Sequence, residues 1–192
     1  MSAPAAPRLG PPDPATMTDA QRAVHEAIAA GPRGRVEGPL AVWLHSPDLA
    51  SRAQALGAYC RFGSALPPRL SELAILIMGA HWQAGFEWHI HAPIAAAAGI
   101  PAAAIEAIRT RHPPVLTAPD AQAVHDFTRE LLDTHTVSDA TYATTHDILG
   151  PRALVDLVGL LGYYSLISMT IKAFTLALPN DAPPPFSSNL KT

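Results

Sequence analysis

Hydrophobic residues recur every three or four positions along most of this chain, which is the spacing of helices that bury one face. Pro, Gly, Ser, Thr and Asp punctuate these segments at points where helices are capped, begun or ended. No stretch alternates apolar and polar residues as a half-buried β-strand does. We therefore predict an all-α fold. The expected helices span approximately residues 20–30, 47–62, 67–83, 86–98, 101–109, 120–132, 138–149 and 151–176.

The stretch from Pro67 to Ile100 combines strong apolar character with many ionisable groups. It is predicted to form two helices separated by a break at Ala84–Gly85. A buried ionisable group costs free energy unless it is paired or its pKa changes. The pattern therefore marks this stretch as the candidate functional site. Five ionisable side chains lie in it among Leu, Ile, Ala, Met and Trp: Glu72, His81, Glu87, His89 and His91.

Helical spacing assigns these side chains to particular faces. The first helix is apolar nearly all round and is therefore expected to be buried, with Glu72 and His81 on opposite faces. Glu87 and His91 are four residues apart, so they are adjacent on the apolar face of the second helix. Pro93 removes one backbone hydrogen bond of that helix and is expected to kink it just after this pair.

The residues alone leave several interpretations open. Glu87 and His91 fit either a functional pair or a surface ion pair along one helix, which contributes only about 0.2–0.5 kcal/mol. Glu72 fits either a site residue or a first-turn glutamate stabilised by the helix dipole. Lys172, in the last helix, fits either an anion-binding residue or a surface residue whose aliphatic part covers apolar neighbours.

The Glu-Trp-x-x-His motif over 87–91, preceded by Glu72 and followed by an Ala-rich helix that ends at Gly99, resembles the carboxymuconolactone decarboxylase family. That family is close to the alkylhydroperoxidase-D-like proteins. The resemblance is strongest over 67–100 and extends over about 20–178. It implies an alkylhydroperoxidase-D-like helical bundle that assembles as a trimer or a multiple of trimers, and a role in the catabolism of aromatic compounds.

The resemblance also indicates which chemistry to expect. Peroxidase members carry a Glu, a Cys-x-x-Cys dithiol and a His, and the two cysteine positions fall on Ala84 and Glu87 of this chain. The dithiol is absent, so we expect no thiol peroxidase activity. The decarboxylase-type pattern that remains implies three catalytic residues, Glu72, Glu87 and His91.

The last helix is implied to pack beside the central pair and to complete a substrate pocket. Tyrosine combines an apolar ring with a polar hydroxyl, which suits a pocket wall. The predicted pocket residues are Trp88, Tyr163, Tyr164 and His81.

The leading hypothesis is a cofactor-free lyase, a decarboxylase, or an isomerase that acts on a small carboxylated lactone or related acid. Decarboxylation of an unsaturated lactone leaves a carbanion delocalised onto the lactone oxygen, and the enzyme must stabilise this charge and protonate carbon. His91 is then the general acid or oxyanion donor. Glu87 sets its charge and orientation or acts as the acid itself, and Glu72 orients the ring.

Two further hypotheses belong to other functional classes. Glu72, Glu87 and His91, with His81 or His89 added, could serve as ligands in a metal-dependent enzyme, since Glu and His bind zinc and iron. Alternatively, the chain is a non-enzymatic oligomeric protein that binds a small ligand.

Length and composition limit the remaining choices. The 192 residues fit one domain over 18–178, with a disordered or extended arm at 1–17 and a loose tail at 179–192. The net charge of −3 and the absence of a basic run argue against nucleic-acid binding. Cys60 is the only cysteine, so the chain has no intramolecular disulfide and no cysteine-based metal cluster.

Hydropathy and charge also bear on localisation and assembly. The N-terminal residues lack the apolar core of a secretory signal, and the apolar run over 157–171 is short for a membrane span. We therefore expect a cytoplasmic protein that does not bind membranes. Only 15% of the residues are charged and alanine is abundant, which favours burial of some surface between copies in a homo-oligomer.

Overall fold

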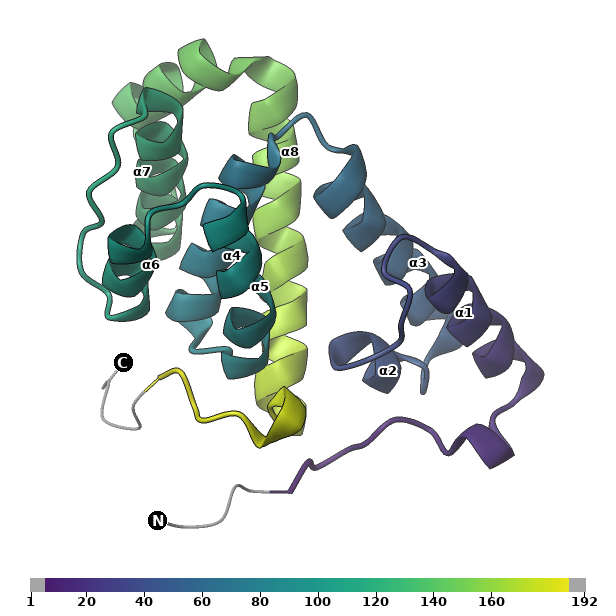
Figure 1. The fold of residues 1–192 in the computed structure, drawn as a ribbon. Helices are drawn as coiled ribbons and strands as arrows, with labels where there is room; N and C mark the ends of the chain where they lie inside the picture. The colour runs from purple at the N-terminus through teal and green to yellow at the C-terminus, as the bar shows by residue number, and fades with distance from the viewer. Residues whose placement is uncertain (1–5, 187–192) are drawn as a thin grey trace.

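The computed structural model of the chain describes residues 6–186, and all regular structure in that range is helical (Figure 1). The predicted all-α class is confirmed. Short 3₁₀ turns occur at Pro14–Thr16 and Pro179–Asp181, and a π-helical turn, η2, spans Tyr59–Gly63. The α-helices are α1 Asp19–Ala30, α2 Pro39–Trp43, α3 Pro47–Ala58, α4 Pro68–Trp82, α5 Gly85–Ala97, α6 Ala102–Arg109, α7 Pro119–Thr134 and α8 Asp139–Phe174.

Local sequence signals account for most helix boundaries. The Thr18 hydroxyl accepts a hydrogen bond from the Gln21 amide while the Gln21 side chain accepts one from the Thr18 amide, a capping box that begins α1. Ser138 caps α8 through the Thr141 amide. Gly150, with a φ of 74°, interrupts the helical backbone of α8 at the predicted boundary between two helices. The label α8 therefore covers two helices that meet at a kink at Gly150, as predicted.

Helix α4 forms the centre of the fold. Every residue from Leu70 to Ala80 is buried, as its nearly uniform apolar sequence predicts. Helices α5, α7 and α8 pack against it, and α6 packs beside α4 and α5. In Figure 1 the long C-terminal part of α8 runs alongside α4 and α5, with α6 and α7 on one side and α1–α3 on the other.

Three hydrogen bonds connect α2, η2 and Ala65 to α8. The Trp43 indole N–H of α2 donates to the Thr170 hydroxyl at 2.9 Å. The Asp156 carboxylate of α8 accepts hydrogen bonds from the Tyr59 hydroxyl and the Ala65 amide, both at 2.7 Å. These contacts fix α2 and η2 relative to α8. They therefore define the space between α8, α5 and the N-terminal helices.

The described parts of the arm and of the tail pack against the domain. The Arg8 amide donates to the Phe174 carbonyl at 2.9 Å, and Phe186 is buried edge-on against Trp88 with ring centroids 5.4 Å apart. The tail up to Phe186 is therefore held down, in contrast to the loose segment expected. A single aromatic contact gives no periodic sequence signal, which explains the difference. Residues 1–5 and 187–192 of the expected arm and tail lie outside the described residues.

Helix α8 is long and apolar enough to cross a membrane by length and composition alone. Within the fold, 61% of its most apolar window is buried against other helices. The same apolar character thus provides the packing surface for α4 and α7.

Asp156→Asn tests the connection between η2 and α8. The substitution keeps the size of the side chain but leaves one acceptor oxygen facing two donors, and the amide adds a further donor. We expect the free energy of unfolding to fall by about 1–3 kcal/mol, measured by urea denaturation. Tyr59→Phe removes one donor only and should cause a smaller loss. An unchanged unfolding midpoint in Asp156→Asn would contradict this role.

Candidate functional site

A buried histidine between two carboxylates forms the centre of the candidate site. Glu72 comes from α4, and Glu87 and His91 come from α5. His91 Nδ1 lies 2.6 Å from Glu72 Oε2, and His91 Nε2 lies 2.8 Å from Glu87 Oε1. All three residues are buried, with exposed fractions of 5% or less. We call this group the Glu–His–Glu triad.

The helix boundary between α4 and α5 makes this meeting possible. Gln83 adopts a left-handed conformation with φ of 50° and ends α4, and the Ala84 amide then donates to the Gly79 carbonyl. The chain reverses here, so α5 packs back along α4. Glu72, one turn into α4, thereby comes beside His91, two turns into α5. The i,i+4 spacing within α5 places Glu87 at the other ring nitrogen.

The triad holds His91 in its protonated form. Burial alone lowers the pKa of His91, but the negative charge of Glu87 and the hydrogen bonds to Glu72 and Glu87 outweigh it and raise the pKa to about 9. The imidazolium therefore donates from both nitrogens at neutral pH. A buried ion group of this kind is tolerated only when its hydrogen bonds are complete, as they are here.

Two tyrosines of α8 lie against the triad. The Tyr164 hydroxyl lies 3.5 Å from His91 Nε2, and the two rings meet edge-on with centroids 5.4 Å apart. Burial raises the pKa of Tyr164 well above its ordinary value, and burial likewise raises the pKa of Tyr163 to about 12. Both residues are therefore neutral phenols at physiological pH, able to donate a hydrogen bond.

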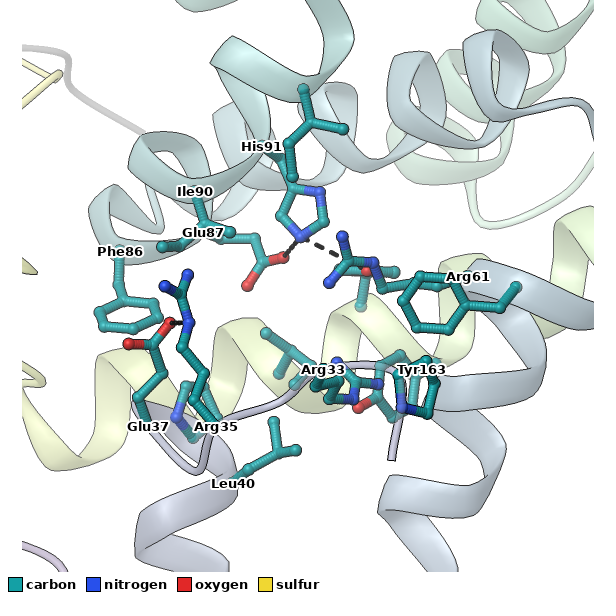
Figure 2. A pocket seen from close by; sticks show the side chains of 16 residues that line it. Arg33, Arg35, Glu37, Leu40, Arg61, Phe86, Glu87, Ile90, His91 and Tyr163 are labelled. Carbon is teal, nitrogen blue, oxygen red and sulfur yellow. Dashed lines mark hydrogen bonds and ion pairs between the residues drawn. The ribbon is translucent and has the colours of Figure 1, made fainter. Parts of the chain in front are cut away.

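The triad opens onto a cavity of about 260 Å³ between α5, α8 and the N-terminal helices (Figure 2). Glu87 and His91 form one side of this cavity, and Arg33, Arg35 and Arg61 form much of the rest. Figure 2 shows the Arg61 guanidinium group reaching toward His91. Apolar side chains complete the lining: Leu40, Phe62, Phe86, Ile90, Ile94 and Ile167. A cavity that is smaller than a drug-sized pocket, partly apolar and cationic suits a small organic acid.

The structure brings most of the predicted site residues together. Glu87, His91, Tyr163 and Tyr164 line the cavity, and Glu72 lies directly behind the His91 ring. The expected position of Glu72 as an orienting residue agrees with this arrangement. The surface ion pair and the simple first-turn glutamate, the other interpretations of these residues, do not fit their burial.

Two predicted pocket residues lie elsewhere. Trp88 does not line the cavity, because it is one position along α5 from Glu87 and so faces a different side, where it contacts Phe186. His81 is half-buried near the end of α4 beside Trp82, and its backbone carbonyl accepts a hydrogen bond from Arg111. Neither side chain has a contact with the triad that would support the predicted role.

Lys172 also lies outside the cavity lining. Its ammonium group lies 3.5 Å from the Gln83 carbonyl, near the C-terminal end of α4. Side chains of this kind donate to terminal carbonyls and complement the helix dipole. This placement favours the surface interpretation of Lys172.

The arginines were not predicted from the sequence. Arg33 and Arg35 belong to the loop between α1 and α2, and Arg61 belongs to η2. Their approach to the triad depends on tertiary contacts across more than twenty residues of sequence, which no local pattern reports. The one available signal was the presence of two arginines in a short Gly/Pro-rich loop, a common location for binding residues.

The triad geometry does not suit a metal ion. Glu72 and Glu87 bind opposite nitrogens of one imidazole ring, so their oxygen atoms do not converge on a common point. Among residues 6–186, no group of three or more His, Cys, Asp or Glu side chains is arranged to hold a metal ion. The metal-dependent alternative therefore lacks a ligand set in this part of the chain.

Comparison with known protein families and with curated proteins finds no match to this chain.

Titration of His91 tests the electrostatics of the triad. Nitrogen NMR of the imidazole is expected to show protonation of both nitrogens at neutral pH and loss of one proton near pH 9. The folded pKa exceeds the unfolded value of about 6.5, so His91 contributes stability below that pH and loses it as pH rises through about 9. The difference in free energy of unfolding between wild type and His91→Gln should therefore shrink as the pH rises from about 6.5 to about 9. Titration of His91 below pH 6.5 would contradict the account.

Proposed function

We propose that this protein is a cofactor-free enzyme that transfers a proton to carbon, a lyase or isomerase acting on a small carboxylated lactone or related acid. The observation that carries this proposal is the protonated His91, held between Glu72 and Glu87 at the wall of a cationic cavity. Acid–base enzymes place a titratable group with a displaced pKa in such a pocket. The resemblance to carboxymuconolactone decarboxylases supports the substrate class.

Decarboxylation is the reaction that uses all these features. The bond between the ring carbon and the carboxylate breaks, CO₂ leaves, and the electron pair enters the conjugated lactone, where the lactone oxygen carries the charge. A proton then binds to carbon and the conjugation is rearranged. Nearby N–H and O–H donors stabilise the developing charge, most strongly in a site that excludes water. In an isomerisation, a carbon–hydrogen bond supplies the electron pair instead: its proton moves to the Glu87 carboxylate, and a proton then returns to another carbon of the substrate.

The residues have distinct roles in this proposal. His91 is the proton store, and the neutral Tyr164 hydroxyl, 3.5 Å from His91 Nε2, is a second group beside it that can donate to the developing negative charge of the substrate. The proton reaches the substrate either from Nε2 directly or through Glu87, which accepts it at Oε1 and presents it to the cavity. Glu72 fixes the ring and keeps it charged, because it binds the nitrogen that faces away from the cavity.

A homo-oligomer is the second part of the proposal. Val155, Val158 and Met169 of α8 are 70%, 47% and 50% exposed, which is unusual for large apolar side chains on one helix. Contact with further copies of the chain would bury them. The family resemblance specifies a trimer or a multiple of trimers.

Substitutions in the triad test the catalytic role. With a panel of carboxylated lactones followed by ultraviolet absorbance and CO₂ release, His91→Ala is expected to lower turnover by about 10²–10⁴. Glu87→Gln removes the negative charge that keeps His91 protonated, so the alkaline limb of the pH profile should move to lower pH. If Glu87 also carries the proton, turnover should fall at every pH.

His89→Ala provides the matched control. His89 lies on the same helix, half-buried and outside the cavity lining, so its loss should leave turnover within about threefold of wild type. Near wild-type turnover in folded His91→Ala would remove His91 from the mechanism. Absence of turnover on every lactone, with ligand binding retained, would favour a non-enzymatic binding protein.

Light scattering tests the assembly. The expected particle has three times the chain mass of 20.3 kDa, or a multiple of that value, at micromolar concentration. A Val155→Glu substitution should shift the particle toward the monomer if the α8 surface is the interface, because a charge would be buried there. A wild-type particle of 20.3 kDa would contradict the proposed oligomer.

A further inference from the structure

Two arginines in the cavity have buried nitrogen atoms without hydrogen-bond partners. These atoms are Nε and Nη2 of Arg33 and Nε of Arg61. The hydroxyl of Tyr163, on the same cavity wall, is also buried without a partner. The three residues come from the α1–α2 loop, η2 and α8, and all three line the cavity (Figure 2).

Buried donors of this kind lower the stability of the fold unless an acceptor binds them. A buried donor without an acceptor loses its hydrogen bonds to water, and the loss is larger for a charged group. Other arginines of this chain satisfy the requirement within the protein. Arg35 pairs with Glu37 at 2.7 Å, and Arg69 pairs with Asp120 at 2.7 Å. Arg33 and Arg61 have no carboxylate partner among the described ion pairs, so an acceptor from outside the chain is the missing component.

Gly57 of α3 leaves space for the side chains of Arg33 and Tyr163. A Cβ atom at Gly57 would collide with the Tyr163 hydroxyl and with Arg33 Nη2. Glycine at this position therefore lets both donors approach the helix backbone side by side. The pKa of Tyr163, raised to about 12 by burial, keeps its hydroxyl protonated, so it remains a donor and not an anion.

The charges indicate the kind of acceptor. Arg33 and Arg61 contribute two positive charges, Arg35 is balanced by Glu37, and His91 lies between two carboxylates. The triad thus contributes one net negative charge when both carboxylates are ionised, and the cavity keeps one positive charge. A singly charged planar oxyanion neutralises it and matches the donor geometry of guanidinium groups.

We propose that Arg33, Arg61 and Tyr163 form a carboxylate-binding subsite that anchors the part of the ligand that does not react. The anchored group would leave the remainder of the molecule facing Glu87 and His91 on the other side of the cavity. The subsite itself stands on the unpartnered donors, and only the identity of the reacting end rests on the proposed function.

Binding of simple carboxylates to the full chain tests this subsite. The probes are acetate, succinate and adipate, titrated by calorimetry and thermal shift against sodium chloride of equal ionic strength, with inorganic phosphate as a separate arm. At least one carboxylate should bind and raise the melting temperature above the chloride control. Arg33→Met and Arg61→Met should each weaken its binding about tenfold or more, the value of a charge-assisted hydrogen bond.

Arg35→Met is the matched control, because Arg35 also lines the cavity but is paired with Glu37 and 64% exposed. It should change carboxylate affinity by less than about threefold, since exposed charges are well screened. Stability without ligand gives a second measure. Buried N–H groups without an acceptor oppose folding, so Arg33→Met and Arg61→Met should melt at or above the wild-type temperature without anions.

Several results would overturn the subsite: no carboxylate effect beyond chloride, equal affinity in wild type and both variants, tighter binding of phosphate, or variants that melt lower while affinity is unchanged. The outcome is separable from that of the proposed function. Carboxylate binding without turnover of any lactone would overturn only the catalytic proposal. Turnover of an acid lactone by a protein whose two variants keep wild-type affinity would overturn only the subsite.

Discussion

The buried imidazolium of His91 is the interaction on which the rest of this structure depends. A charged ring in an apolar helix pair is stable only because Glu72 and Glu87 each accept a hydrogen bond from it. Removing either carboxylate would leave a buried charge poorly compensated. The turn at Gln83–Ala84 and the packing of α5 on α4 are therefore requirements of the triad as well as features of the fold.

The segments before α4 also place charged side chains around the cavity next to the triad. Asp156 anchors η2 to α8, and this anchor places Arg61 near the triad. The α1–α2 loop adds Arg33, whose unused donors lie against α3 at Gly57. A negatively charged triad and a cationic wall thus face each other across a small space. The proposed ligand, with an acidic group and a carbon that accepts a proton, would complement both sides.

The sequence predicted the parts of this arrangement that depend on helical periodicity. The i,i+4 pair of Glu87 and His91, the buried character of α4 and the boundary at Gly150 all follow from local spacing and from glycine and proline. The partnership of Glu72 with His91 joins two helices, and periodicity alone left it open. The family resemblance supplied that pairing as an expectation, and the distance of 2.6 Å agrees with it.

The parts that were missed depend on contacts between distant segments. Arg33 and Arg61 lie in a loop and a π-helical turn, where no periodic pattern predicts which way a side chain points. Trp88 was predicted to line the pocket, yet adjacent helical residues face different directions, and Trp88 contacts Phe186 instead. Burial of Phe186 against Trp88 likewise requires knowledge of where the tail runs.

The most direct test of the central claim is a crystal structure with a saturated carboxylated lactone, which lacks the conjugation that decarboxylation requires. The compound carries two carboxylates, one on the ring carbon that would lose CO₂ and one distant from it. We expect the distant carboxylate between Arg33 and Arg61, with the lactone ring against Glu87 and His91. A compound bound only outside the cavity, with water alone between the arginines and the triad, would contradict it.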